Sequence, residues 1–188
     1  MLRRASEQLR YFLSAVMFLT RIPCPAWLGY EPHYLSMARW YFPVVGSLLG
    51  LLAGLVFYVC SLILPVSVAL LLSIITLINI TGAFHEDGLA DSADGFGGAY
   101  EKAGVLRIMK DSRIGTYGTV ALISALSLKF FILLELANIE PWYVLIILPI
   151  AHSYSRVFCG LFSRFFSLCS RRRRQQKQAN SRRQVFKA

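Results

Sequence analysis

Residues 40–85 read WYFPVVGSLLGLLAGLVFYVCSLILPVSVALLLSIITLINITGAFH, and none of these 46 side chains belongs to Asp, Glu, Lys or Arg. A single helix needs about 20 apolar residues to cross the hydrocarbon core of a bilayer. The stretch is therefore long enough for two crossings joined by a tight turn, which we place at Pro65. A buried helix of a soluble protein would show a polar face at the helical period, and this stretch has no continuous polar face.

The hydropathy of the whole chain predicts an all-α fold, a polytopic membrane helix bundle of about four spans. Apolar residues make up 56% of the chain, against about 45–50% in an ordinary soluble domain. The apolar run from Tyr11 to Thr20 is too short to span, and no cleavage site of small residues follows it. We interpret it as a short N-terminal interfacial or re-entrant helix. The spans are expected at 40–64, 66–84, 118–137 and 142–163.

Positive charge is distributed unevenly between the two sides of these spans. The segments before the first span, between the second and third, and after the fourth hold 18 of the 20 Lys and Arg residues. The turns at Pro65 and at 138–141 hold none. The positive-inside rule then places both termini and an acidic loop, 85–117, in the cytoplasm.

Residues 164–188 form a basic tail that follows a membrane domain of residues 1–163. The tail carries nine Lys and Arg residues and no acidic residue, so it accounts for nine of the ten net positive charges. Runs of like charge are typical of solvated, disordered arms, and beside a membrane span they favour anionic lipid. We therefore expect membrane lipid as a partner and no nucleic acid, and a homo-oligomer stays open.

Glycines recur every four residues in the first expected span, at Gly46, Gly50 and Gly54. Small residues at this spacing let helix backbones approach closely in a membrane, so we expect a packing seam. Ionisable side chains inside spans are costly and usually face a polar interior. Arg156 is one of these, and it either faces the active site or extends its charge to the membrane interface.

The polar segment after residue 84 holds six of the ten acidic residues of the chain, between positions 86 and 111. Asp87, Asp91 and Asp94 are spaced i, i+4 and i+7, which places their carboxylates on one helical face. Such a face repels itself unless a cation neutralises it, and carboxylate oxygens suit Mg²⁺. The segment therefore predicts a divalent-metal site.

The other polar residues of this segment are assigned by position. Glycines between 88 and 98 weaken a helix but let backbone approach a bulky phosphate. Beyond a short helix expected at 101–109, Asp111 and Arg113 are placed to supply a further ligand and a guanidinium for phosphate. His85 is placed to bind phosphate or orient a carboxylate. An Asp/Gly-rich segment is otherwise a solvated turn, which is our interpretation of Glu86 and Glu101.

Several of these strings resemble one known family, the cobalamin synthases, which are the adenosylcobinamide-GDP ribazoletransferases of bacteria and archaea. The string His85-Glu-Asp-Gly-Leu-Ala-Asp-Ser-Ala-Asp-Gly95 is long and specific. The resemblance runs from about residue 10 to about residue 162. Its other pieces are Phe18-Leu-Thr-Arg-Ile-Pro23, Phe42-Pro-Val-Val-Gly46, Thr81-Gly-Ala-Phe84, Met109-Lys-Asp-Ser-Arg-Ile-Gly-Thr-Tyr-Gly118 and Ser155-Arg156.

The resemblance implies an Mg²⁺-dependent transferase in the last steps of cobalamin biosynthesis. Such an enzyme joins α-ribazole, or its 5′-phosphate, to adenosylcobinamide-GDP and releases GMP, forming adenosylcobalamin or its 5′-phosphate. It implies a multi-pass protein of the bacterial cytoplasmic (inner) membrane. The implied roles are metal binding for Asp87, Asp91 and Asp94, catalysis for Asp111 (as base or further ligand) and His85, and substrate binding for Arg113 and Arg156.

The chain departs from the family after residue 162, where the composition changes abruptly to Arg and Gln. We interpret the tail as a truncated or frameshifted remnant. One alternative is an inactive, truncated membrane protein whose polybasic tail binds lipid. Another is a phosphoalcohol transferase of lipid synthesis, whose pattern has Arg where this chain has Asp91, and this disfavours it.

Overall fold

The computed structural model describes residues 2–28 and 32–162, and within these ranges the chain is helical and has no strand. The all-α prediction is confirmed. Three helices are long and apolar enough to cross a membrane, or four if a bent pair counts as one span. The predicted basic tail, 164–188, lies outside the described residues. The helices are α1 (Leu2–Leu19), η1 (Ala26–Leu28), α2 (Pro32–Ala38), η2 (Arg39–Tyr41), α3 (Phe42–Ser61), α4 (Val66–Thr81), α5 (Phe84–Gly98), α6 (Lys102–Ile108), α7 (Thr116–Ile139) and the helix Pro141–Phe162.

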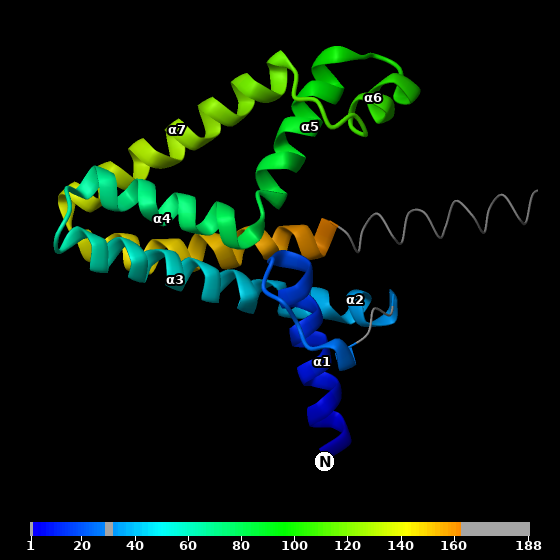
Figure 1. The fold of residues 1–188 in the computed structure, drawn as a ribbon, viewed down its shortest axis with the longest axis horizontal. Helices are drawn as coiled ribbons and strands as arrows, with labels where there is room; N and C mark the ends of the chain where they lie inside the picture. Colours follow the sequence, from blue (N-terminus) through cyan, green and yellow to red (C-terminus); the bar gives the residue numbers. More distant parts are fainter. Residues whose placement is uncertain (1, 29–31, 163–188) are drawn as a thin grey trace, which may run out of the picture.

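The glycine seam predicted in the first span is a helix–helix contact. Helix α3 runs beside the helix Pro141–Phe162 (Figure 1). A Cβ on Gly50 would lie 2.5 Å from the carbonyl oxygen of Leu148, and one on Gly46 would lie 2.6 Å from that of His152. Since backbone atoms block both positions, only glycine allows this approach, and the packing prediction is confirmed.

Helices α3 and α4 form a hairpin around the predicted turn at Pro65, since α3 ends at Ser61 and α4 begins at Val66. The hydroxyl of buried Ser73 donates a 2.7 Å hydrogen bond to the carbonyl oxygen of Ala53 across this pair. Hydrogen bonds of this kind hold helices together where water cannot compete. The second predicted turn is also confirmed, since α7 ends at Ile139 and the next helix begins at Pro141.

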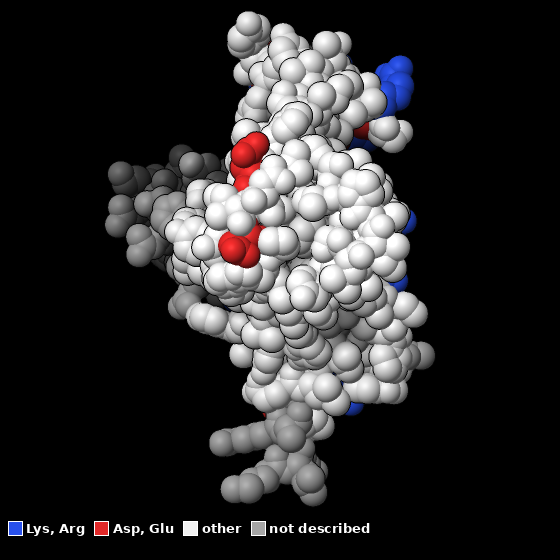
Figure 2. Space-filling model, turned by 90° about the vertical axis from the view of Figure 1, so that its left-hand side faces the viewer, with Lys and Arg blue, Asp and Glu red and all other residues white. Residues whose placement is uncertain are grey.

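Both turns lie at the same end of the molecule, opposite α5 and α6 (Figure 1). Figure 2 looks onto this end, and the middle of the visible surface carries acidic side chains but no Lys or Arg. The distribution matches the charge count of the two turns.

The second span is shorter than predicted. Helix α4 has 16 residues, which at about 1.5 Å per residue gives roughly 24 Å, against about 30 Å for a bilayer core. The chain then turns by 84° into α5. The expected span 66–84 is wrong at its end, because Gly82 and Ala83 both adopt left-handed backbone angles, with φ of 66° and 57°. Two successive residues in this conformation end a right-handed helix.

The segment after α1 is bound to this bend. The backbone N–H of Arg21 donates a 2.8 Å hydrogen bond to the carbonyl oxygen of Ile80, and its guanidinium lies against Gly82. A side chain at Gly82 would have to displace the exposed side chain of Arg21, in addition to adopting left-handed angles.

Helix α1 confirms the predicted N-terminal helix, although it is longer than the apolar run and spans 18 residues. Near its end, the ring of Phe18 stacks on Phe42 and meets Phe84 edge to face, both at 5.4 Å between centroids. The starts of α3 and α5 are thus joined through one aromatic side chain. The interfacial or re-entrant position of α1 stays a prediction.

We expect Gly50→Ala to lower the free energy of unfolding by about 1–3 kcal/mol, the usual cost of overpacking, because backbone atoms of Leu148 and Pro149 block the added methyl group. Thermal unfolding in detergent measures the effect. Gly88→Ala is the control, since a Cβ there meets nothing within 4 Å. Equal melting temperatures for the two variants would contradict the seam.

We expect Gly82→Ala to destabilise the protein by at least about 1–2 kcal/mol, the cost of left-handed angles for an L residue, with added strain against Arg21. The matched control is Ala83→Gly, which relieves the same kind of strain at the next position and should leave the melting temperature unchanged or higher. If both variants lower it equally, the bend does not depend on these angles.

Candidate functional site

The predicted polar loop 85–117 is mostly helical. Helix α5 covers Phe84–Gly98 and α6 covers Lys102–Ile108, close to the short helix expected at 101–109. The first turn of α5 carries Glu86 and Asp87, whose negative charge is favoured at a helix N-terminus. The acidic residues are therefore held on a rigid element and not on a flexible loop.

The three aspartates of α5 differ in exposure. Asp87 is exposed, Asp91 is half-buried, and Asp94 is buried with 8% of its surface accessible. The spacing i, i+4, i+7 does place the three on one side of the helix. Asp94, the last of them, lies against the start of α7 and is therefore covered. Only the first two carboxylates of the series are open to solvent.

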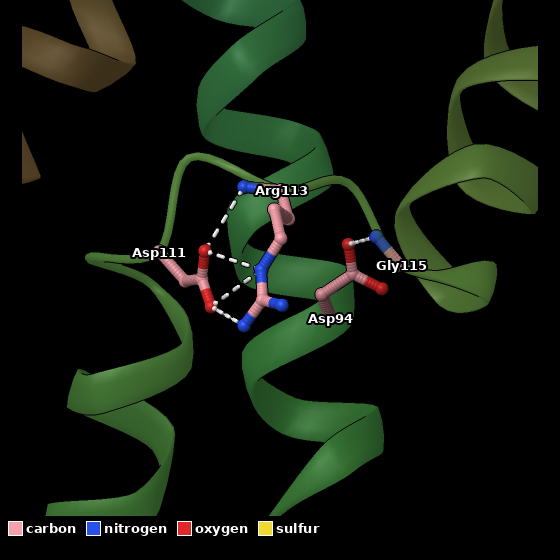
Figure 3. A network of polar contacts seen from close by, with 4 residues as sticks. All are labelled: Asp94, Asp111, Arg113 and Gly115. Carbon is pink, nitrogen blue, oxygen red and sulfur yellow. Dashed lines mark hydrogen bonds and ion pairs between the residues drawn. The ribbon is translucent and has the colours of Figure 1, made fainter.

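Asp94 binds the N-terminus of α7. Its carboxylate accepts a 2.7 Å hydrogen bond from the backbone N–H of Gly115 and a 2.8 Å bond from that of Gly118 (Figure 3 shows the first). These donors belong to the first turn of α7, which has no capping side chain of its own. Asp94 therefore performs the part of an N-cap residue from another helix. A Cβ on either glycine would collide with this carboxylate.

Most glycines of α5 make room for neighbouring helices. A Cβ on Gly95 would lie 2.8 Å from Cγ of Met109, and one on Gly97 would lie 2.5 Å from the ring of Tyr117. Gly98 is similarly close to α6. Of the glycines expected to admit a phosphate, only Gly88 has open space around it.

Asp111 and Arg113 form a bidentate ion pair, in which the guanidinium donates at 2.7 Å from its terminal nitrogen and at 3.1 Å from Nε (Figure 3). The hydrogen bonds from Arg113 hold the pKa of the Asp111 carboxyl below its usual range, and the carboxylate raises the pKa of Arg113. Asp111 is therefore ionised at neutral pH and is a weaker proton acceptor than a free aspartate.

One polar cavity of about 430 Å³ collects the acidic residues. It lies between α5, the segment after α6 and α7. The predicted site residues among its lining are Asp87, Asp91, Asp94, Asp111 and Arg113. The structure thus brings together five of the seven residues predicted from the sequence.

The carboxylates fit a hard divalent cation by their chemistry. Within the described residues, no three His, Cys, Asp or Glu side chains lie close enough to form a ready-made metal cage. Mg²⁺ does not require one, because it is commonly held by one or two carboxylates together with water and substrate phosphates. Asp87 and Asp91 leave their oxygens available for this, whereas Asp94 already accepts two hydrogen bonds.

His85 lines a neighbouring cavity of about 170 Å³ and not the acidic one. Glu86 lines both cavities, and one of its carboxylate oxygens is buried without a hydrogen-bond partner among the described residues. Lys129 of α7 faces it across the smaller cavity. Our interpretation of Glu86 as a solvated turn residue is therefore wrong. Its spacing of four and eight residues from the buried Ala90 and Asp94 is the signal that places it on the inward face.

Arg156 is buried, with 3% of its surface accessible, and lies outside the acidic cavity. Its guanidinium donates to the carbonyl oxygen of His152 and to the hydroxyl of Ser155, and contacts Nδ1 of the His152 ring at 2.8 Å. The side chain is therefore buried, and the alternative of a charge at the membrane interface stays a prediction. Its contact with a substrate stays a prediction.

The fold and this cavity define a polytopic helical membrane protein with an acidic cavity beside its spans. The chain belongs to the cobalamin-5-phosphate synthase family, whose family model matches residues 11–186. The match extends beyond residue 162, where the resemblance of the motifs ends. No solved structure matches the chain.

Several curated relatives carry the name adenosylcobinamide-GDP ribazoletransferase. The protein of Shewanella amazonensis is 52% identical over 154 residues, which are 82% of this chain and 59% of the relative. That of Shewanella frigidimarina is 49% identical over 80% of this chain and 58% of the relative, and that of Shewanella woodyi 46% over 82% and 60%. The chain spans about three fifths of the length of these relatives.

We expect Asp94→Ala to destabilise the protein without any ligand, because the buried N–H of Gly118 loses its acceptor at about 1–3 kcal/mol and the half-buried N–H of Gly115 loses its acceptor as well. Asp87→Ala is the matched control, since its carboxylate is exposed and forms no hydrogen bond that α7 needs. Thermal unfolding in metal-free detergent solution separates the two. A loss of stability that is equal in both variants would contradict the capping role.

Proposed function

We propose that the chain transfers α-ribazole, or its 5′-phosphate, onto adenosylcobinamide-GDP and releases GMP. The observation that carries the proposal is that residues of two separate motif segments, His85–Gly95 and Met109–Gly118, line the acidic cavity together. The names of the relatives support the same substrates. A phosphoalcohol transferase has no comparable support.

The reaction is a displacement at phosphorus. A hydroxyl of the ribazole attacks the phosphorus on the cobinamide side of the diphosphate, and the bond from that phosphorus to the oxygen of the GMP group breaks. The hydroxyl proton passes to a carboxylate of the cavity.

The remaining residues bind and orient the diphosphate. We propose that Asp87 and Asp91 hold Mg²⁺, with Asp111 as a further oxygen ligand. When bound, the cation neutralises charge on the phosphates and favours departure of GMP. The side chain of Arg113 is 87% exposed beside the cavity, so it is accessible to an incoming phosphate. His85, in the adjoining cavity, orients Glu86 or contacts the substrate.

We also propose a location in the bacterial cytoplasmic membrane, with both termini and the acidic cavity on the cytoplasmic side. The support is the charge distribution. The end of the molecule that carries the two turns lacks Lys and Arg in its middle (Figure 2). Four cationic residues instead lie in the polar segment 85–117 that contains the acidic residues: Lys102, Arg107, Lys110 and Arg113. A site at the membrane surface suits a large, partly apolar corrinoid.

The test is release of GMP by the full chain in detergent with adenosylcobinamide-GDP, α-ribazole and Mg²⁺. We expect turnover, and we expect Asp91→Ala to reduce it roughly 100–1000-fold, the scale of losing one group that stabilises transition-state charge. Glu101→Ala is the control, since Glu101 is exposed and does not line the cavity. Folded protein without turnover would overturn the proposed activity.

A further inference from the structure

Another cavity of about 170 Å³, distinct from the one that His85 lines, lies between the start of α3 and the end of the helix Pro141–Phe162. Two arginines line it, Arg39 from η2 and Arg156. No Asp or Glu is among its lining residues, so its charged groups are cationic only. The cavity shares no lining residue with the acidic cavity described above.

Both arginines keep hydrogen-bond donors without an acceptor. The Nε atoms of Arg39 and Arg156 are buried and have no hydrogen-bond partner among the described residues. Neither guanidinium forms an ion pair within the described part of the chain. Arg156 is almost wholly buried, and Gly46 of α3 leaves no space beside its side chain. Arg39 is half-buried, and a terminal nitrogen of Arg156 already donates to His152 and Ser155, so the buried Nε atoms are the donors that lack a partner. Two neighbouring guanidiniums without a carboxylate favour an anion with oxygen acceptors, such as a phosphate group.

The rest of the cavity wall is apolar, from Pro43, Val157 and Leu161 among others. Val157 and Leu161 are 39% and 58% exposed on a helix long and apolar enough to span a membrane, so this wall is accessible to an apolar chain. Arg39 is the last charged residue before the 46-residue uncharged stretch, and Trp40 follows it. Arg and Trp at the edge of a span mark the level of lipid headgroups.

We propose that this cavity binds the phosphate group of an anionic phospholipid. The two guanidiniums contact the phosphate, and an acyl chain follows the exposed side of Val157 and Leu161. A free phosphate offers the same oxygen acceptors but no apolar chain for this wall. The proposal does not depend on the transferase activity.

The test uses the full chain, immobilised in detergent with equal amounts of phosphatidylglycerol and phosphatidylcholine. A wash at high salt removes lipid that is held only by surface charge, because salt screens it. Lipid that remains is extracted and quantified by mass spectrometry. We expect phosphatidylglycerol to be retained in severalfold excess over phosphatidylcholine, and Arg39→Gln or Arg156→Gln to abolish the excess.

Arg107→Gln is the matched control, since it removes an exposed arginine of α6 that does not line the cavity, and we expect it to retain the lipid. Val157→Trp fills the cavity but keeps both charges, so it should release the lipid even if the arginine variants fail to fold. A parallel wash with inorganic phosphate should not displace the lipid, and displacement would identify a site for free phosphate. Equal retention of both lipids, or retention in Val157→Trp, would overturn the proposal.

Discussion

The 84° bend between α4 and α5 is the constraint on which the rest of the site depends. Two successive residues with left-handed angles end the apolar helix and direct the acidic helix away from it. Ala83 carries strain there that an L residue normally avoids. The hydrogen bond from Arg21 to Ile80 and the aromatic contact of Phe18 with Phe84 hold the strained bend in place. The motif Phe18–Pro23 therefore influences the acidic cavity by fixing the direction of α5.

Once α5 is directed by the bend, its buried face meets α7 and α6. Asp94 caps α7, and three glycines admit the side chains packed against α5. Both features fix the distance between α5 and the segment that carries Asp111 and Arg113. Asp94 thus helps to position Asp87 and Asp91, the two more exposed carboxylates of the cavity. All three belong to the same motif, and their different burial gives them different roles.

The sequence predicted the helical class, both short turns, the glycine seam and five of the residues that share the acidic cavity. These depend on hydropathy, on charge and on spacing, which a linear pattern records. It did not predict the end of α4, since Ala83 is a good helix former and only tertiary contacts hold it at a positive φ. Nor did it separate Asp94 from Asp87, because the period of a helix shows which residues share a face but not which neighbour covers it. Glu86 was misjudged for the same reason.

The acidic cavity and the cavity lined by Arg39 and Arg156 differ in the charge of their side chains. In the acidic cavity five carboxylates outnumber the cationic side chains of Lys110 and Arg113, which is why we propose that a cation accompanies the diphosphate there. In the other cavity two guanidiniums stand without a carboxylate, so the proposed lipid phosphate needs no further cation there. The proposed diphosphate substrate and the proposed lipid headgroup are therefore not interchangeable between the sites. On this proposal Arg156, which the motifs associate with the substrate, belongs to the lipid site.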